Sequence, residues 1–379
     1  MAETSAIEWL AGGSTWNPFA AFTDPTDPTD EPKRGWFCIH VDDGCTNCYA
    51  AKMNEFRGTG YDYIKQNLDK HRFEIIRRPD SQSDINWPIR VSRPRRIFPC
   101  SMTDLFAEWH PEQWIDELFA TMLLADWHTF IITTKQETRM VEYLMHPERE
   151  ARIMNQVAFK LQTMPASIRN RPWRFLSQTD AYLPMRNVLV GVSISNQKSA
   201  DRRRDYLRTI ANDGWATWVS FEPALSPINW DGWDFLYWLV SGGESGVFGR
   251  PSHPDCHRGA RDFAKAHDIK YFFKQWGKYY PVGRLYNRKA ATPGMKLLDE
   301  DEGAFQVTIN GQVLKADASG EFRSKVSRYS KSLLSIPAGT CEMLTVRQKQ
   351  DPERKGNQKV PAILDGRCWH EFPKLNLHG

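Results

Sequence analysis

The sequence predicts an α/β fold with a parallel sheet, which is either an open sheet or a partial or incomplete (β/α) barrel. From about residue 95, short apolar, β-branched runs alternate with amphipathic helical stretches. Those runs are apolar at almost every position, which is typical of parallel strands covered on both faces. The chain has 379 residues, of which 41% are hydrophobic and 25% charged. This is the composition of a globular protein long enough for one large barrel or two mid-sized domains.

Seven strands are expected in this sheet. They lie near 7–16 and at 95–101, 128–134, 187–194, 217–222, 235–243 and 269–276. Helices are expected between them at 111–126, 137–146, 199–212 and 256–268. A further helical segment, YAAKMNEF, follows Cys48. In a barrel of parallel strands the functional residues lie at the carboxyl ends of the strands, so a site is expected there.

The barrel domain is expected to span residues 1–282. The Pro/Asp repeat DPTDPTD predicts an inserted loop at 19–35, and a cysteine-containing loop follows at 36–50. Residues 283–379 predict a C-terminal basic extension. It contains a β-hairpin near 305–316, because FQVTINGQVLKA alternates around Asn310-Gly311.

Charge is uneven along this extension. Residues 322–360 hold nine Lys and Arg against three Asp and Glu, a net of +6, whereas the whole chain has a net charge of +4. A segment of this kind is either a solvated face or a contact for nucleic-acid phosphate.

Several classes of protein are disfavoured by the sequence. It contains no run of 18 uncharged apolar residues, so no membrane partner is expected. The N-terminus lacks the pattern of a secretory signal, and a cytoplasmic location is therefore expected. Seven cysteines are an odd number, which favours metal or redox chemistry over a disulfide framework in such a protein.

Three cysteines lie close together. Cys38, Cys45 and Cys48 form a C-x6-C-x2-C pattern on a loop that leads into a helix. Three thiolates can hold three irons of a [4Fe–4S] cluster and leave the fourth iron for substrate or S-adenosylmethionine (SAM). Structural zinc is the alternative, with His40 completing a Cys3His set, and unliganded thiols are the third possibility. The remaining cysteines are expected to be free buried thiols: Cys100, Cys256, Cys341 and Cys368.

The predicted strands end in polar residues. These ends are at 101–104, 133–135, 193–196, 220–223, 242–245 and 274–276. Any one of them is explained by a strand that ends in water, but six in succession favour a shared polar pocket at one mouth of the barrel. A cysteine loop before such a mouth favours the catalytic cluster over zinc. For Lys135 and Lys274, a salt bridge to a neighbouring acidic residue is the alternative to a substrate contact.

An ordered set of segments extends over nearly the whole chain. They are IEW at 7–9 with TWNP at 15–18, the cysteine loop with Tyr49-Ala50, SMTDLF at 101–106, HTFIITTK at 128–135, NVLVGVSISNQ at 187–197, SFEPALSP at 220–227, GGESGVFGRP at 242–251, FFKQWG at 272–277 and LDGRCWHEFP at 364–373. In these segments and in their order, the sequence resembles a phage-encoded radical-SAM-like protein family. Two features depart from the family pattern: the segment 19–37 looks inserted, and Ile194-Ser195-Asn196 stands where the family reads Val-Glu-Asn.

The resemblance implies a barrel of the radical SAM type and a set of site residues. It assigns the cluster to Cys38, Cys45 and Cys48. It assigns catalytic roles to Lys135, Glu222 and Lys274. It assigns cofactor binding to Asn17, Ser101, Asp104, Ser193, Glu222, Gly242, Gly243 and Glu244. Among these, Asp104 or Glu244 would accept from the SAM amino group, Glu222 would bind ribose hydroxyls, and the lysines and Arg250 would pair with the SAM carboxylate or an anionic substrate.

The implied activity is reductive cleavage of SAM to a 5′-deoxyadenosyl radical, with electrons from a reductant such as flavodoxin. A phage-like family and a basic segment favour a hypermodified nucleobase of phage DNA, or a nucleotide, as the substrate to be modified or isomerised in the host cytoplasm. Two alternatives remain. One is a radical SAM enzyme on a small molecule or peptide. The other is a non-catalytic zinc or cluster protein that binds nucleic acid.

Overall fold

Seven parallel strands form the main sheet, and their spatial order follows the chain: β1-β5-β6-β7-β8-β9-β10. The strands are β1 (Ser14–Trp16), β5 (Arg96–Pro99), β6 (Thr129–Thr134), β7 (Val188–Ile194), β8 (Ala216–Phe221), β9 (Trp238–Gly242) and β10 (Lys270–Gln275). Within the described residues β1 and β10 are the two edges of the sheet, so the barrel is incomplete. The predicted fold class is confirmed.

The computed structural model describes residues 5–23, 31–171, 173, 182–246, 248–250, 252–284, 306–309, 312–316, 322–323, 344–348, 362–364 and 367–373. In this part of the chain no helix is long and apolar enough to span a bilayer.

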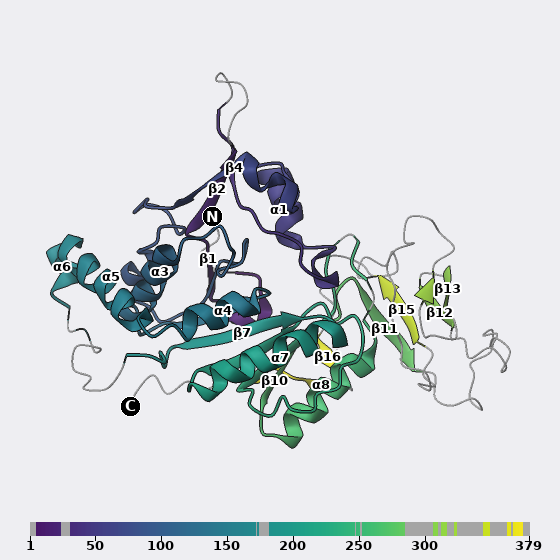
Figure 1. The fold of residues 1–379 in the computed structure, drawn as a ribbon. Helices are drawn as coiled ribbons and strands as arrows, with labels where there is room; N and C mark the ends of the chain where they lie inside the picture. Colours follow the sequence, from purple (N-terminus) through teal and green to yellow (C-terminus); the bar gives the residue numbers. More distant parts are fainter. Residues whose placement is uncertain are drawn as a thin grey trace.

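Helices follow most of the strands along the chain, and the longer ones cover the outer face of the sheet (Figure 1). They are α2 (Trp87–Arg90), α3 (Glu112–Leu124), α4 (Glu137–Leu144), α5 (Arg149–Thr163), α6 (Ala166–Arg169), α7 (Gln197–Asn212) and α8 (Pro254–Ala266). Because parallel crossovers are right-handed, strands in simple chain order place their helices on one face of the sheet. The sequence predicts α3, α4, α7 and α8 but misses α5. The spacing of its buried residues Ile153, Val157 and Lys160 was the available signal.

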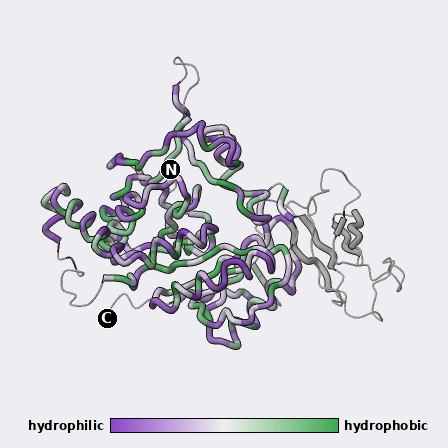
Figure 2. The backbone as a smooth tube through the Cα atoms, viewed as in Figure 1, coloured by the Kyte–Doolittle hydropathy of each residue, from purple (hydrophilic) through white to green (hydrophobic). Residues whose placement is uncertain are grey.

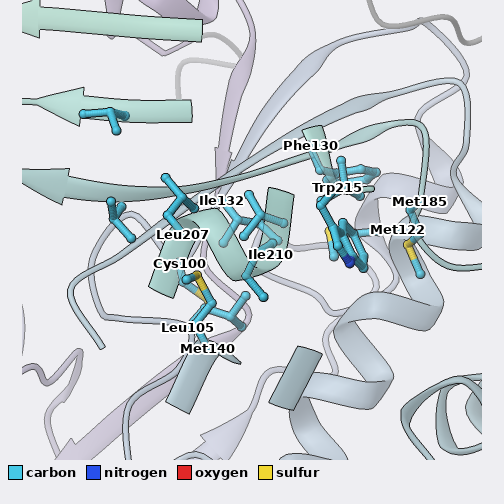
Figure 3. Close-up of a cluster of buried hydrophobic side chains, with 14 of the residues drawn as sticks. Cys100, Leu105, Met122, Phe130, Ile132, Met140, Met185, Leu207, Ile210 and Trp215 are labelled. Atoms are coloured by element: carbon cyan, nitrogen blue, oxygen red, sulfur yellow. The ribbon is translucent and has the colours of Figure 1, made fainter. Parts of the chain in front are cut away.

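The two faces of each strand have different partners. On β7, Val190 and Val192 belong to the larger core, which includes Leu207 and Ile210 of α7. Figure 3 shows Leu207 and Ile210 beside Ile132 of β6. Along α7 and α8 the backbone trace alternates between hydrophilic and hydrophobic residues (Figure 2), as expected for helices that cover a sheet with one face.

The inner face of the sheet is apolar at one end and polar at the other. Leu189 and Trp218 pack there against Trp9 of the short helix η1 (Glu8–Leu10). Further along β7 and β8 the inward positions become Ser193 and Ser220, because successive inward side chains are two residues apart. The polar residues therefore lie at the carboxyl ends of the strands, where the sequence places the site.

The segment predicted as an inserted loop at 19–35 contains strands at both ends. β2 (Phe19–Thr23) pairs antiparallel with β3 (Arg34–Gly35) and with β4 (His71–Ile75). The apolar run FAAFT buries its first three residues, so it gains more from pairing and burial than from remaining a loop. The Pro/Asp repeat at 24–30 lies outside the described residues.

A second sheet begins at the end of the barrel. Its order is β11-β15-β12-β13-β14, built from β11 (Tyr279–Arg284), β12 (Gln306–Ile309), β13 (Gln312–Ala316), β14 (Phe322–Arg323) and β15 (Leu344–Gln348). β12 and β13 pair antiparallel on either side of positions 310–311, which is the hairpin position that the sequence predicts.

The end of the chain returns to the barrel. After the hairpin of β16 (Ile363–Leu364) and β17 (Arg367–Cys368), Phe273 of β10 donates its N–H to the Trp369 carbonyl at 2.7 Å, and Glu371 donates to the Tyr271 carbonyl at 3.0 Å. Leu364 and Trp369 are part of the main core. These residues of the predicted C-terminal extension therefore pair with the edge of β10, where strand N–H and C=O groups would otherwise lack partners.

Candidate functional site

The cysteine loop is held to the carboxyl ends of the strands by Asp42. Asp42 caps the 3-10 turn η2 (Asp43–Cys45), where its Oδ1 accepts from the Gly44 N–H at 3.0 Å. Its Oδ2 lies 2.6 Å from Nη1 of Arg203 on α7, a side chain with no exposed surface. Lys135, at the end of β6, lies 3.5 Å from Asp42 Oδ1. Burial by itself would raise the pKa of the Asp42 carboxyl, but Lys135 and Arg203 lower it overall.

The ion pair of Glu244 and Arg250 holds the other end of the cysteine loop. The Arg250 guanidinium binds both carboxylate oxygens of Glu244, at 2.7 and 2.6 Å. The Asn47 amide donates to the same carboxylate at 3.0 Å, and Arg250 also donates to the Asp43 carbonyl at 2.9 Å. Glu244 and Arg250 are both buried, so this charge pair joins the loop after β9 to the cysteine loop within the protein.

The three cysteines share one electrostatic environment. Burial raises the pKa of the Cys38 thiol well above its ordinary value, and the charges of Asp104, Cys48 and Cys45 raise it further. Burial also raises the pKa of Cys48. Cys48 directly precedes helix α1 (Tyr49–Arg57), whose first N–H groups favour an anion at that position. The ammonium of Lys135 lies 3.3 Å from Cys45 Sγ.

The donor set fits an iron–sulfur cluster by its chemistry. Three thiols lie with a helix N-terminus and the partly buried ammonium of Lys135, and each thiolate of a cluster binds a different iron. Within the described residues no group of three or more His, Cys, Asp or Glu is arranged to hold a single metal ion. His40, the fourth ligand of the zinc alternative, is exposed and its ring packs edge-on against Tyr63.

Polar side chains without partners line the inner face beside the cysteine loop. Thr133 Oγ1 on β6 and Ser195 Oγ after β7 are buried atoms without a hydrogen-bond partner in the described structure. Lys274 on β10 lies 3.1 Å from Glu222 Oε1, the salt bridge to a strand-end acid that was the alternative for this lysine. Since unsatisfied buried polar atoms cost free energy, they are the natural contacts of a polar ligand.

The structure brings the predicted strand-end residues to neighbouring positions on one edge of the sheet, but several are already bonded within the protein. Asp104 accepts from Thr134 Oγ1 at 2.6 Å, from the Lys135 N–H at 2.8 Å and from the Phe106 N–H at 3.0 Å. Burial raises the pKa of Asp104, although these hydrogen bonds oppose the rise. Asp104 therefore orders the turns after β5 and β6.

Asn17 and Ser101 join the first two strands. The Asn17 amide donates to Ser101 Oγ at 3.1 Å and accepts from the Met102 N–H at 3.1 Å. The Tyr49 hydroxyl donates to the Ser101 carbonyl at 2.5 Å, which ties the first turn of α1 to the end of β5. Ser193 Oγ donates to the Glu222 carbonyl at 3.3 Å.

The two glycines after β9 are required by close approach. A Cβ on Gly242 would lie 2.4 Å from Glu222 Oε1, and one on Gly243 would lie 2.1 Å from the Trp276 carbonyl oxygen. Any larger residue would displace the Glu222 side chain or the chain after β10. Contacts within the protein are therefore enough to require glycine at both positions, without any contact to a cofactor.

Sequence reasoning missed the residues that hold the cysteine loop. Asp42, Asn47 and Arg203 were not singled out. Arg203 lies in the run RRRD, which is typical of a solvated helix face, and its complete burial follows only from tertiary packing. For Asp42, the available signal was an Asp two residues before a glycine at the start of a turn.

The other cysteines stand apart from the three in the loop. Cys100 and Cys256 are free and buried, as predicted. Cys368 is exposed, contrary to expectation, because β17 lies at the surface of its hairpin. Cys341 lies outside the described residues.

Comparison with known proteins adds a distant structural similarity. No curated protein matches the sequence. A solved structure of a spore photoproduct lyase double mutant with bound AdoMet and dinucleoside spore photoproduct matches with a TM-score of 0.28 and 12% identity. The match covers 71% of this chain and 61% of that chain. Residues 4–373 match the family described as protein of unknown function (DUF5131), and the chain therefore belongs to that family.

Proposed function

We propose that the protein is a radical SAM enzyme that binds a [4Fe–4S] cluster through Cys38, Cys45 and Cys48. The observation that carries the proposal is the gathering of three thiols at the carboxyl ends of an incomplete parallel barrel, with Lys135 in contact with Cys45. When bound, the cluster would supply the electron that cleaves SAM reductively. The chain's own residues hold the loop that carries the thiols, through Asp42 at one end and Asn47 at the other.

The inner wall supports SAM binding beside the loop. Ser195 and Thr133 present polar atoms without partners to this space in the described structure, and the Glu222 carboxylate lies beside them, paired with Lys274. Lys274 on β10 pairs with Glu222. Its ammonium would bind the SAM carboxylate if that carboxylate replaced Glu222 as its partner. Glu222 is therefore the residue most directly suited to SAM ribose hydroxyls, whereas Glu244 and Asp104 act by holding the loops around them.

The first experiment tests the cluster. In the triple variant Cys38→Ala, Cys45→Ala, Cys48→Ala we expect the loss of iron, of brown colour and of 5′-deoxyadenosine formation from SAM under a chemical reductant. Cys100→Ala and Cys256→Ala are matched controls, since both thiols are free, buried and not part of the cysteine loop. These controls should retain iron. Stoichiometric zinc without iron in anaerobically purified protein contradicts the proposal.

We propose a nucleobase of DNA, or a nucleotide, as the substrate. The support is the net +6 charge of residues 322–360, although their side chains lie outside the described part of the structure. Mass spectrometry of nucleosides from phage DNA made with and without the gene tests the substrate directly. Neutralising Arg323, Lys325, Arg328, Arg354 and Lys355 tests the basic segment, and it should reduce the salt dependence of DNA binding.

A further inference from the structure

A buried guanidinium on α7 contacts the cysteine loop and the end of β6 at the same time. Arg203 Nη1 lies 2.6 Å from Asp42 Oδ2 and donates to the Ser193 carbonyl at 3.0 Å. Its Nη2 donates to the Lys135 carbonyl at 3.4 Å. The Arg203 side chain has no exposed surface, so these contacts lie in the interior of the protein. One side chain thus joins the two segments that carry Cys45 and Lys135.

Glu137 of α4 fixes Arg203 from the other side. Arg203 Nε lies 3.1 Å from Glu137 Oε2, and the Glu137 side chain is buried. The same carboxylate also binds Nε of Arg202, the preceding residue on α7, whose side chain is 52% exposed. Arg203 therefore lies between two carboxylates, one on a helix and one on the cysteine loop. Because a buried charge that loses its partner is strongly destabilising, this arrangement favours keeping both carboxylates in place.

Asp42 links this guanidinium to Cys45. Asp42 Oδ1 lies 3.6 Å from Cys45 Sγ and 3.5 Å from Lys135 Nζ. The Lys135 ammonium in turn lies 3.3 Å from Cys45 Sγ. A Cβ on Gly44 would lie 3.1 Å from Asp42 Oδ1 and 3.2 Å from Lys135 Nζ, so the glycine lets the loop approach both charges closely. The place of the ammonium beside Cys45 thus depends on where Asp42 is held.

We propose that Arg203, fixed by Glu137, is a positioning residue that keeps the Lys135 ammonium against Cys45 and thereby raises the reduction potential of the cluster. Arg203 acts through Asp42 rather than by touching a thiol. A cation beside a ligating thiolate stabilises the extra electron of a reduced cluster, and the residues that orient such a cation therefore tune the potential. The proposal rests on the proposed function, because it needs a cluster bound by Cys45.

The neighbouring arginine provides a matched control. Arg202 and Arg203 follow each other on α7 and both bind Glu137, but Arg203 is the one that reaches Asp42. If the pairing with Glu137 served only to join α4 to α7, neither arginine would affect the cluster. Positioning through Asp42 instead predicts an effect of Arg203 and none of Arg202.

The experiment is a redox titration of the full chain after cluster reconstitution, followed by electron paramagnetic resonance. We expect Arg203→Lys to lower the midpoint potential by about 30 mV, a threefold change in a one-electron equilibrium. A lysine keeps the charge but lacks the fork that bridges two carboxylates, so Asp42 is released and draws the Lys135 ammonium away from Cys45. Arg202→Lys should keep the wild-type potential. In an Asp42→Asn background Arg203→Lys should lower the potential by clearly less, because the group through which it acts has lost its charge.

A second variant tests the same contact from α4. Glu137→Asp keeps the carboxylate but withdraws it by one methylene group, which should draw Arg203 away from Asp42. The potential should therefore fall in the same direction as in Arg203→Lys. This variant decides the question if Arg203→Lys does not fold.

The outcomes separate this proposal from the proposed function. Urea unfolding of the same variants without cluster measures the structural part of each substitution. A loss of stability in Arg203→Lys and Glu137→Asp with an unchanged potential would make Arg203 a structural residue and overturn the proposal, while the cluster and its chemistry stand. An equal shift with and without the Asp42 carboxylate would also contradict it, because Arg203 would then act by another route. If wild type binds no iron–sulfur cluster, the proposed function fails and this inference fails with it.

Discussion

Lys135 joins the cysteine loop to the sheet through one side chain. Its backbone N–H donates to Asp104, and its ammonium lies 3.3 Å from Cys45 Sγ and 3.5 Å from Asp42 Oδ1. Burial alone would lower the pKa of Lys135, but Cys45 and Asp42 raise it overall. The side chain therefore remains a cation beside a thiol that the proposed cluster would use as a thiolate.

A first prediction concerns the potential of the proposed cluster. Lys135→Gln should lower its reduction potential by roughly tens of millivolts, because a neighbouring cation stabilises the extra electron of the reduced form. The measurement is a redox titration of the reconstituted protein followed by electron paramagnetic resonance. Lys274→Gln is the control, since that lysine pairs with Glu222 and not with a cysteine. Equal potentials in wild type and Lys135→Gln would refute the assignment.

The two glutamates of the mouth should respond differently to substitution. Glu244→Ala leaves the buried Arg250 guanidinium without its carboxylate, which costs about 3–5 kcal/mol of unfolding free energy. Glu222→Gln should cost much less stability but weaken SAM binding by about 1–3 kcal/mol through a lost charge-assisted hydrogen bond. Urea unfolding and calorimetric titration of SAM measure the two effects. The opposite pattern, with a stable Glu244→Ala that fails to bind SAM, would make Glu244 the direct ligand.

At the scale of elements, the important addition to the barrel is the segment 362–373. It hydrogen-bonds along β10 and inserts Trp369, which is 7% exposed, into the main core. The Trp369 indole donates to the Leu364 carbonyl at 3.1 Å, which links β16 to the residue after β17. An edge strand that would otherwise expose unpaired N–H and C=O groups is covered in this way.

The next prediction tests the packing of this segment against the barrel. Trp369→Ala should reduce the free energy of unfolding by about 3–5 kcal/mol, because a large buried side chain is removed and a cavity remains. Trp369→Phe, which keeps most of the ring, should cost clearly less. Urea denaturation monitored by circular dichroism compares the two variants with wild type. Wild-type stability in Trp369→Ala would mean that the segment does not belong to the core.

At the scale of the whole molecule, buried histidines make the free energy of unfolding depend on pH in the acid range. Burial lowers the pKa of His110 to about 3, of His128 to about 4 and of His257 to about 3. His257 lies between two serine hydroxyls, with Nε2 2.9 Å from Ser252 Oγ and Nδ1 3.1 Å from Ser241 Oγ. These rings stay neutral in the folded protein at a pH where they are charged in the unfolded chain.

Stability should therefore fall as the pH drops below the unfolded histidine pKa of about 6.5. Between that value and the folded pKa values of about 3 to 4, the unfolded state binds more protons, so each ring contributes a loss of up to about 1.4 kcal/mol per pH unit. Above that range the contribution of these rings is constant. Urea unfolding from about pH 7 down to about pH 5 measures the slope. His257→Gln should reduce it, whereas His370→Gln, at the surface, should not. An unchanged slope in His257→Gln would contradict the assignment.

Much of the fold was predictable because it depends on local patterns. The apolar runs of all seven strands and the amphipathic spacing of α3, α4, α7 and α8 are visible within windows of a few residues, and parallel strands bring their polar ends to one edge whatever the details of packing. The cysteine loop was visible for the same reason, since its three thiols lie within eleven residues. By itself, then, the sequence determined the parallel sheet of the incomplete barrel, the edge on which its polar strand ends gather and the three thiols of the candidate site.

Only the tertiary structure decided how that site is held. Asp42 meets Arg203 across 161 positions of the chain, and Asn47 meets Glu244 across 197. No pattern in a short window links such residues, because their pairing depends on which strands become neighbours and which side chains lose their contact with water. The return of Trp369 to β10 has the same origin. Burial and long-range pairing are properties of the packed molecule, and for that reason they appeared only in three dimensions.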